Sequence, residues 1–451
     1  MTFRSVLIAN RGEIAVRIQR ACRALGLRTV AVYSEADRGA LHVREADQAL
    51  CIGPAMPSRS YLDATALLFA AEASGAQAVH PGYGFLSENA DFAEQVQAAG
   101  LSFIGTDARC IRTMGDKIEA RRAMRAVGLP CVPGSEGALP ADPVAALEVA
   151  RAVGFPVILK ASGGGGGRGM RVVHADADLA GALALTREEA RRAFGNSEVY
   201  LERYLLQPRH VEIQVLADGQ GHALWLGSRD CSLQRRHQKV IEEAPAPHLD
   251  PDAVQALGAR CAQACLHLGY RGVGTFEFLF ERGEFFFIEM NTRLQVEHPV
   301  TEATTGIDIV QQQIRVARGE ALSLRQEEIV ATGHAIECRI NAEDPRRFVP
   351  SPGRITRCRW PEGPGIRVDT HVGAGDRVPA HYDSLIGKLI VYASTRAAAI
   401  ERMRAALAAT VIGGISTNLP LHCELLADPA FLSGGVDIHH LERLLASRAT
   451  R

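Results

Sequence analysis

Apolar and polar positions alternate in blocks along the first quarter of the chain. An apolar run at 5–9 is followed by apolar residues at helical spacing from Ile14 to Leu25, and a second apolar run lies at 28–34. This order predicts a strand, a helix and a strand, the unit from which parallel sheets are built. Residues 1–113 are therefore predicted to form a doubly wound α/β domain.

A smaller unit follows the first domain. Two apolar segments, 155–162 and 170–175, flank a run of glycines, and helical spacing near 176–195 comes next. Two strands on either side of a glycine loop, with a helix beside them, are typical of a lid. We predict a lid subdomain at 131–204.

From residue 210 the pattern becomes that of antiparallel strands. Polar and apolar residues alternate at 210–218, and the segment 274–291 reads as a hairpin with Gly283 in its turn. The lid and these strands are assigned to one central domain, 114–331. Short strands, many turns and a late helix predict a mixed α+β domain at 332–445.

Composition narrows the class of protein. The chain has 451 residues, which is longer than a single hydrophobic core usually supports, so several domains are expected. Its net charge is -1. That balance argues against nucleic-acid binding, which normally needs a basic surplus. No apolar run approaches the roughly 20 residues of a membrane helix, and the first residues lack the apolar length of a signal peptide. Ten scattered cysteines without a CxxC pair fit a reducing compartment, so a cytoplasmic protein is expected.

Lysine is scarce in this sequence. Of 50 basic residues only four are lysines, and 46 are arginines. The four are Lys117, Lys160, Lys239 and Lys388. Each is a candidate for a site that needs a compact ammonium, which a guanidinium fork cannot replace.

The glycine run at 163–167 fits several templates. Gly164, Gly166 and Gly169 match GxGxxG, but a dinucleotide site needs a helix at the third glycine, and MRVV reads as a strand. A P-loop needs Lys followed by Ser or Thr after the last glycine, where Met170 and Arg171 stand. A free linker rarely lies between two strands. The favoured interpretation is a hairpin tip whose backbone N–H groups fold over phosphates.

The hairpin of the central domain carries a polar face. If its turn is the three residues 281–283, Glu277 and Glu289 share one face, and the odd positions from 289 to 297 continue it if the segment stays extended. Two carboxylates and the amide of Asn291 would suit a hard cation such as Mg²⁺. Arg293 could clamp a small anion, and Glu297 could accept a proton. A solvated strand face is the alternative.

The segment RDCSLQRRHQKVIEE at 229–243 concentrates positive charge. Arg235, Arg236 and Lys239 would attract polyphosphate, although a solvated basic face would look the same. Arg339, on an alternating strand, would by itself be an ordinary strand arginine.

Several longer motifs together resemble one family. They are ANRGEIAVRI, HPGYGFLSEN, MGDK, KASGGGGGRGMRVV, RDCSLQRRHQKV, FIEMNTRLQVEHPVTE and GHAIECRINAEDP. They resemble biotin carboxylase, an ATP-grasp enzyme, over about residues 1–445. The resemblance implies an ATP-grasp fold with an N-terminal pre-ATP-grasp domain. AHYDSLIGKLIVY and INAEDP favour the free-standing subunit of bacterial acetyl-CoA carboxylase, which serves malonyl-CoA and fatty acid synthesis.

The resemblance also implies a chemistry and its residues. ATP, bicarbonate and Mg²⁺ (or Mn²⁺) would be used to carboxylate N1′ of biotin through carboxyphosphate. The implied ATP-binding residues are Lys117, Lys160, Gly164, Gly165, Gly166, Gly167, Glu202, Leu205, His210, Gln234, His237 and Leu279. The implied metal ligands are Glu277, Glu289 and Asn291. The implied bicarbonate and biotin residues are Lys239, Arg293, Gln295, Val296, Glu297, Arg339 and Tyr83, with Glu297 as general base and Arg339 stabilising the biotin enolate.

Partners follow from the same resemblance. None of the seven methionines precedes a lysine, the usual setting of a biotinylated lysine, so biotin is expected on a separate carrier protein, with carboxyltransferase subunits as further partners. A homodimer is expected, although Ala24 and Pro364 stand where the family contact would place an acid and an aromatic residue. The rival interpretations are another ATP-grasp ligase, such as a carbamoyl-phosphate synthetase module, and a non-catalytic nucleotide-binding regulator.

Overall fold

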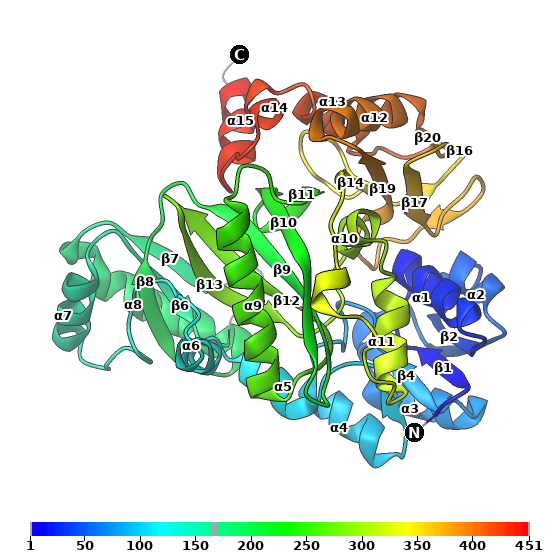
Figure 1. The fold of residues 1–451 in the computed structure, drawn as a ribbon, viewed down its shortest axis with the longest axis horizontal. Helices are drawn as coiled ribbons and strands as arrows, with labels where there is room; N and C mark the ends of the chain where they lie inside the picture. The colour runs from blue at the N-terminus through cyan, green and yellow to red at the C-terminus, as the bar shows by residue number, and fades with distance from the viewer. Residues whose placement is uncertain (1, 164–168, 450–451) are drawn as a thin grey trace.

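The computed structural model describes residues 2–163 and 169–449. Its N-terminal part is a parallel sheet between two layers of helices (Figure 1). Its strand order is β3-β2-β1-β4-β5. Val6 and Ile8 of β1 enter the core shared with helix α1, while Leu7 enters the core shared with α3 and α4. Alternate residues of one strand therefore fill cores on both faces, and this is the predicted doubly wound arrangement. The elements are β1 Ser5–Ile8, α1 Gly12–Ala24, β2 Arg28–Ser34, α2 Leu41–Glu45, β3 Gln48–Gly53, α3 Ala64–Ser74, β4 Ala78–His80, α4 Ala90–Ala98, β5 Ser102–Phe103 and α5 Ala108–Gly115.

The lid is a three-stranded antiparallel sheet in the order β7-β6-β8, with two helices on its apolar face. Lys160 pairs with Met170, so β6 and β7 form a hairpin around the glycine run and the linker interpretation is excluded. Gly164 to Gly167, predicted to close over phosphates, lie outside the described residues. The elements are α7 Pro143–Val153, β6 Val157–Ala161, β7 Met170–Val173, α8 Asp176–Phe194 and β8 Val199–Arg203.

An eight-stranded antiparallel sheet forms the centre of the molecule, in the order β13-β12-β9-β10-β11-β14-β19-β17 (Figure 1). Its members come from both the central and the C-terminal regions, because β11 pairs with β14 from Ile241–Cys338 to Ala244–Ala335. Nothing in the hydrophobic pattern indicated this continuity. The strands are β9 Arg209–Asp218, β10 Ala223–Arg235, β11 Gln238–Ala244, β12 Arg271–Glu281, β13 Glu284–Asn291, β14 His334–Asn341, β17 Ile366–Thr370 and β19 Leu385–Ala393.

Helices cover the central sheet and close the C-terminal core. Helix α9 packs on β9 and β10, and α12 packs on β14 and β19. None of the helices in the described part of the chain has the length and hydropathy needed to cross a bilayer. The remaining elements are α6 Lys117–Ala126, α9 Pro251–Leu268, α10 His298–Thr305, α11 Ile309–Ala317, β15 Gly353–Arg354, β16 Arg357–Arg359, β18 Arg377–Val378, α12 Arg396–Ala409, β20 Val411–Gly413, α13 Leu419–Leu425, α14 Pro429–Ser433 and α15 His440–Ala449, with short 3-10 turns at Glu35–Asp37, Pro57–Arg59 and Gln326–Glu328.

Candidate active site

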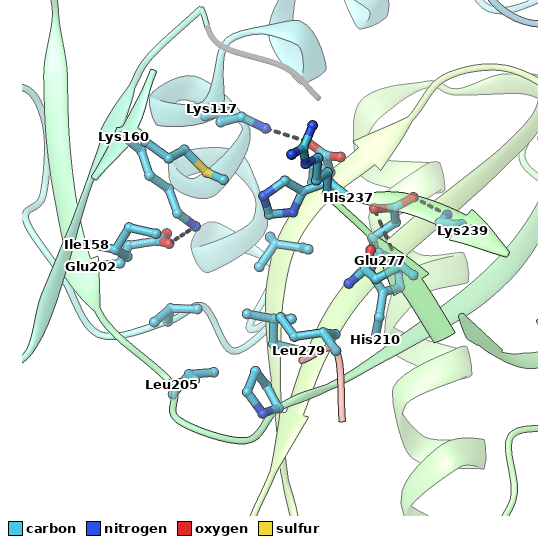
Figure 2. Close-up of a pocket in the computed structure, with 18 of the residues that line it drawn as sticks. Lys117, Ile158, Lys160, Glu202, Leu205, His210, His237, Lys239, Glu277 and Leu279 are labelled. Atoms are coloured by element: carbon cyan, nitrogen blue, oxygen red, sulfur yellow. Dashed lines mark hydrogen bonds and ion pairs between the residues drawn. The ribbon is translucent and has the colours of Figure 1, made fainter. Parts of the chain in front are cut away.

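A cavity of about 590 Å³ lies between the lid and the central sheet (Figure 2). Most of the residues predicted for a site line it, although they come from strands, turns and the start of helix α6, spread over more than 200 positions. The predicted residues on its wall are Lys117, Lys160, Glu202, Leu205, His210, Gln234, His237, Lys239, Glu277, Leu279, Glu289, Asn291, Arg293, Gln295, Val296, Glu297 and Arg339. Tyr83 is not on this wall; its hydroxyl donates to Glu13 in the N-terminal domain.

The lid side of the cavity carries two lysines. Lys160 on β6 donates to Glu202 on β8 at 2.5 Å, and Lys117, the first residue of α6, donates to Glu289 (Figure 2). The Lys117 ammonium lowers the pKa of Glu289 to about 2, against the effect of burial. Apolar side chains, among them Leu205 and Leu279, lie beside these charges. The arrangement offers cations for phosphates next to an apolar surface for a planar ring.

Two carboxylates face one another across the hairpin of β12 and β13. The predicted three-residue turn is wrong: Glu281 pairs with Glu284, so the turn is Arg282–Gly283, both in the left-handed region. That turn alone would place Glu289 on the opposite face from Glu277. A bulge at 288, where the register shifts by one residue, restores the pairing of Glu277 with Glu289. Their shared face, expected from the sequence, is therefore present for a different reason.

The segment after β13 is not extended. The strand ends at Asn291, and residues 292–297 leave the sheet and lead into helix α10. The prediction of an alternating face up to 297 is therefore wrong, because a turn replaces the strand. The turn still directs Gln295 to the site, where its amide donates to Glu277 at 2.8 Å.

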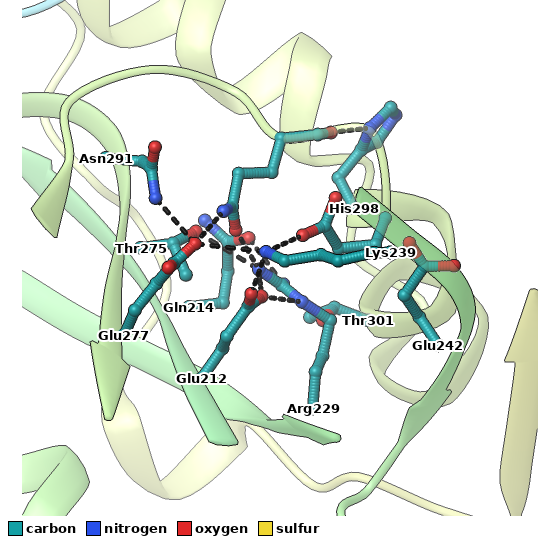
Figure 3. Close-up of polar contacts among 12 residues, drawn as sticks. Glu212, Gln214, Arg229, Lys239, Glu242, Thr275, Glu277, Asn291, His298 and Thr301 are labelled. Carbon is teal, nitrogen blue, oxygen red and sulfur yellow. Dashed lines mark hydrogen bonds and ion pairs between the residues drawn. The ribbon is translucent and has the colours of Figure 1, made fainter. Parts of the chain in front are cut away.

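Lys239 lies at the centre of the acidic cluster (Figure 3). Its ammonium is 3.0 Å from Glu277 Oε1 and 2.6 Å from Glu297 Oε1, and it also donates to Glu212. Burial would lower the pKa of Lys239, but the three carboxylates hold it well above its ordinary value. Lys239 on β11 therefore stays positively charged and binds carboxylates from strands β9 and β12 and from the turn that holds Glu297.

Glu297 is 1% exposed and lies between two cations. Arg339 Nη2 donates to its Oε2 at 3.0 Å, and Lys239 donates to its Oε1. Burial alone would raise the pKa of Glu297, but Lys239 and Arg339 bring it below the ordinary glutamate value. The carboxylate is therefore ionised at neutral pH and can accept a proton.

Arg229 is a member of the site that sequence reasoning did not single out. It is 0% exposed and lies behind Lys239, where it binds Glu212 through two nitrogens at 2.9 and 3.0 Å (Figure 3). It also donates to Gln214 and Gln295, each at 2.7 Å. Its position in the RDCS motif was the available signal, but nothing local distinguishes it from Arg235 on the same strand.

Two other predicted cations have different surroundings. Arg293 donates to Glu88 of the N-terminal domain at 2.9 Å and to Asn291 Oδ1 at 2.8 Å. Arg235 lies over the ring of Phe348, 3.7 Å from its centroid, and is not among the lining residues, whereas Arg236 is. The polyphosphate hypothesis for this hairpin therefore rests on Arg236 and Lys239.

His210, on the cavity wall, lies beside two carboxylates. Its Nε2 lies 3.0 Å from Glu212 and 3.3 Å from Glu277. Burial would lower the pKa of His210, but these carboxylates raise it to about 9. The imidazole is therefore protonated at neutral pH.

The donor set fits a divalent cation. Glu277 and Glu289 are paired directly across the hairpin, so both carboxylates extend from the same face of the sheet, and hard cations favour such oxygen ligands. Asn291 is turned with its amide nitrogen 2.7 Å from Glu277 and its oxygen toward Arg293. The two carboxylates are thus the better-supported ligands.

The fold, the lid hairpin and this cavity define an ATP-grasp ligase. Models of three domain families match in order: "Biotin carboxylase, N-terminal domain" at 2–111, "Carbamoyl-phosphate synthase L chain, ATP binding domain" at 116–325 and "Biotin carboxylase C-terminal domain" at 337–443. The chain belongs to the biotin carboxylase family.

Whole-chain comparisons agree with this membership. Biotin carboxylase of Pseudomonas aeruginosa is 60% identical over 440 residues, 98% of each chain, and that of Haemophilus influenzae is 58% identical over the same length and share. A solved biotin carboxylase from Campylobacter jejuni superimposes with a TM-score of 0.95 at 48% identity, covering 98% of this chain and 99% of that one. The flanking domains therefore separate this chain from a carbamoyl-phosphate synthetase module, whose ATP-binding domain it shares.

Proposed function

We propose that this chain uses ATP and bicarbonate to carboxylate N1′ of biotin on a separate carrier protein, as the first half-reaction of acetyl-CoA carboxylase. The observation that carries the proposal is the carboxylate of Glu297, held between Lys239 and Arg339. It lies on the wall of a cavity that also holds the paired carboxylates Glu277 and Glu289.

ATP is proposed to bind between the lid and the central sheet. The Campylobacter jejuni structure is described as a complex with "beta-gamma-ATP", and that of a Hydrogenobacter thermophilus 2-oxoglutarate carboxylase domain as a complex with MgADP and bicarbonate. In this chain Lys117 and Lys160 would hold the phosphates. Glu277 and Glu289, with Asn291 beside them, would hold Mg²⁺ or Mn²⁺, which neutralises and orients the phosphate oxygens when bound.

Bicarbonate is proposed to lie against Lys239, Arg293 and the turn at 295–297. Glu297 takes the bicarbonate proton, and a bicarbonate oxygen attacks the γ-phosphorus while the bond to ADP breaks. The carboxyphosphate so formed separates into CO₂ and phosphate, and the phosphate removes the N1′ proton of biotin. Arg339 stabilises the resulting enolate oxygen, and N1′ then attacks CO₂.

The partners are proposed from the same family. Biotin would arrive on a carrier protein, and a carboxyltransferase would take the carboxyl group onward. The related Hydrogenobacter thermophilus domain is described as a dimer, which supports a homodimer here. The relatives at 58–60% identity are named biotin carboxylase, whereas a pyruvate carboxylase subunit of Methanothermobacter thermautotrophicus is 48% identical.

The test follows ¹⁴C-bicarbonate into biotin with the purified chain and MgATP. Acid-labile label on free biotin, or on a biotinylated carrier, is the expected result. Label in neither acceptor would contradict the proposal. Parallel reactions with an acetyl-CoA carboxyltransferase or a pyruvate carboxyltransferase, each with its substrate, then distinguish the two acceptors. Transfer of the labelled carboxyl group to acetyl-CoA is expected.

A further inference from the structure

Lys388 is the one lysine of the four for which the proposed chemistry has no use. It lies on β19, is 0% exposed and pairs in register with Arg339 on β14. Burial would lower the pKa of Lys388, but Glu13, Glu337 and Asp369 raise it above the ordinary lysine value. A buried cation of this kind persists only where its partners compensate for desolvation.

The partners of Lys388 come from two other parts of the chain. Its ammonium donates to the backbone carbonyl of Val296 at 2.9 Å and lies 3.2 Å from Glu13 Oε1 on helix α1. Glu13 in turn accepts from the hydroxyl of Tyr83. The N-terminal helix, the C-terminal sheet and the turn of the central domain therefore meet at one ammonium.

The contact with Val296 bears directly on the site. Residues 292–297 have left the sheet, so no strand pairing fixes this turn. Gln295 is held through its side chain by Glu277 and Arg229. Lys388 holds the backbone one residue before Glu297.

We propose that Lys388 is a positioning residue: it fixes the Val296 carbonyl and thereby sets the turn at 295–297 against which bicarbonate binds. The proposal deepens, and rests on, the proposed function. It also accounts for the retention of lysine among 46 arginines, because one compact ammonium can bind a carbonyl and a carboxylate in a space closed to solvent, where a planar guanidinium is larger.

The test compares three variants with the unaltered protein. Lys388→Met removes the ammonium but leaves Glu13 buried without its cation, so it can fail for structural reasons alone. The double variant Glu13→Gln/Lys388→Met removes both charges and retains a hydrogen-bonding group for Tyr83. Glu13→Gln alone keeps the bond from Lys388 to Val296 and is the matched control.

Two readouts decide the result. In steady-state ATP cleavage, kcat/KM for bicarbonate should fall roughly tenfold or more in the double variant, as for loss of one charged hydrogen bond. The KM for ATP should stay within about twofold, since no ATP contact is altered. Amide hydrogen exchange in peptides covering 292–300 should be faster in the double variant than in Glu13→Gln, at similar thermal stability.

An unchanged kcat/KM for bicarbonate in the double variant would overturn the positioning role. Equal losses of kcat/KM for bicarbonate and for ATP, together with lower thermal stability, would also overturn it. If the unaltered protein shows no bicarbonate-dependent ATP cleavage, the proposed function fails. Exchange at 292–300 then still tests Lys388: equal rates in the double variant and in Glu13→Gln would refute its hold on the turn.

Discussion

Replacing Arg229 by methionine tests whether the buried polar network holds the site together. Arg229 is 0% exposed, and methionine fills a similar length without charge. The change leaves Glu212 Oε2 without either of its arginine bonds. It also removes the donor that Gln214 Oε1 and Gln295 Oε1 each use at 2.7 Å.

The expected loss of stability follows from these contacts. Each buried amide oxygen left without a donor costs about 1–3 kcal/mol. Removing one partner from a buried ion pair costs about 3–5 kcal/mol. Glu212 keeps Lys239 and His210 as partners, which reduces its share. We therefore expect Arg229→Met to lower the free energy of unfolding by about 3 kcal/mol or more. We also expect lower activity, because Gln295 loses one of the two side chains that hold it and keeps only Glu277.

Arg235→Met is the matched control on the same strand. Arg235 is only partly buried and lies over the Phe348 ring, a contact worth about 0.5–1 kcal/mol when exposed. Urea denaturation of both variants, followed by circular dichroism, measures the difference. A loss in Arg229→Met no greater than that in Arg235→Met would refute the reasoning.

Three further predictions concern protons in the site. Glu297→Gln should lower kcat by about 100-fold or more, because the general base is lost, while the KM for ATP changes little; normal turnover would exclude Glu297 as base. Lys239→Met should move the acidic limb of the kcat/KM profile to higher pH, because the ammonium that lowers the pKa of Glu297 is gone; an unmoved limb would contradict that coupling. The raised pKa of His210, about 9, means that its contribution to stability is present below about pH 6.5 and is lost as pH rises through 9. The midpoint of urea denaturation should therefore fall over that pH range, and it should fall less in His210→Gln. An equal fall of the midpoint in both proteins would contradict this contribution.

The fold class was within reach of the sequence, and the prediction is confirmed. Periodicity identified the parallel N-terminal unit, and two strands flanking glycines identified the lid hairpin, because both signals are local. The pairing of β11 with β14, which makes the central sheet continuous, joins segments about 90 residues apart. The residue pattern of neither strand indicates which strand it pairs with. The domain limits at 113 and 331 remain predictions.

The site shows the same division. Alternation along the strands predicts that Glu277 and Glu289 share one face, and they do. The predicted three-residue turn is wrong, and a bulge restores the pairing. Scarcity of lysine singled out Lys239 and also Lys388, but only the structure shows that Lys388 reaches Val296 from another domain. Arg229 could not be separated from its neighbours, because burial depends on the packing of distant strands. The roles assigned to the site residues remain predictions.

In the proposed reaction a bicarbonate oxygen attacks the γ-phosphate after Glu297 removes the bicarbonate proton. The most direct measurement uses ¹⁸O-bicarbonate with MgATP, the purified chain and biotin, followed by mass spectrometry of the released phosphate. The phosphate should carry one oxygen from bicarbonate, and Glu297→Gln should slow this transfer by about 100-fold or more, as it slows turnover. Phosphate whose new oxygen comes only from water would contradict it.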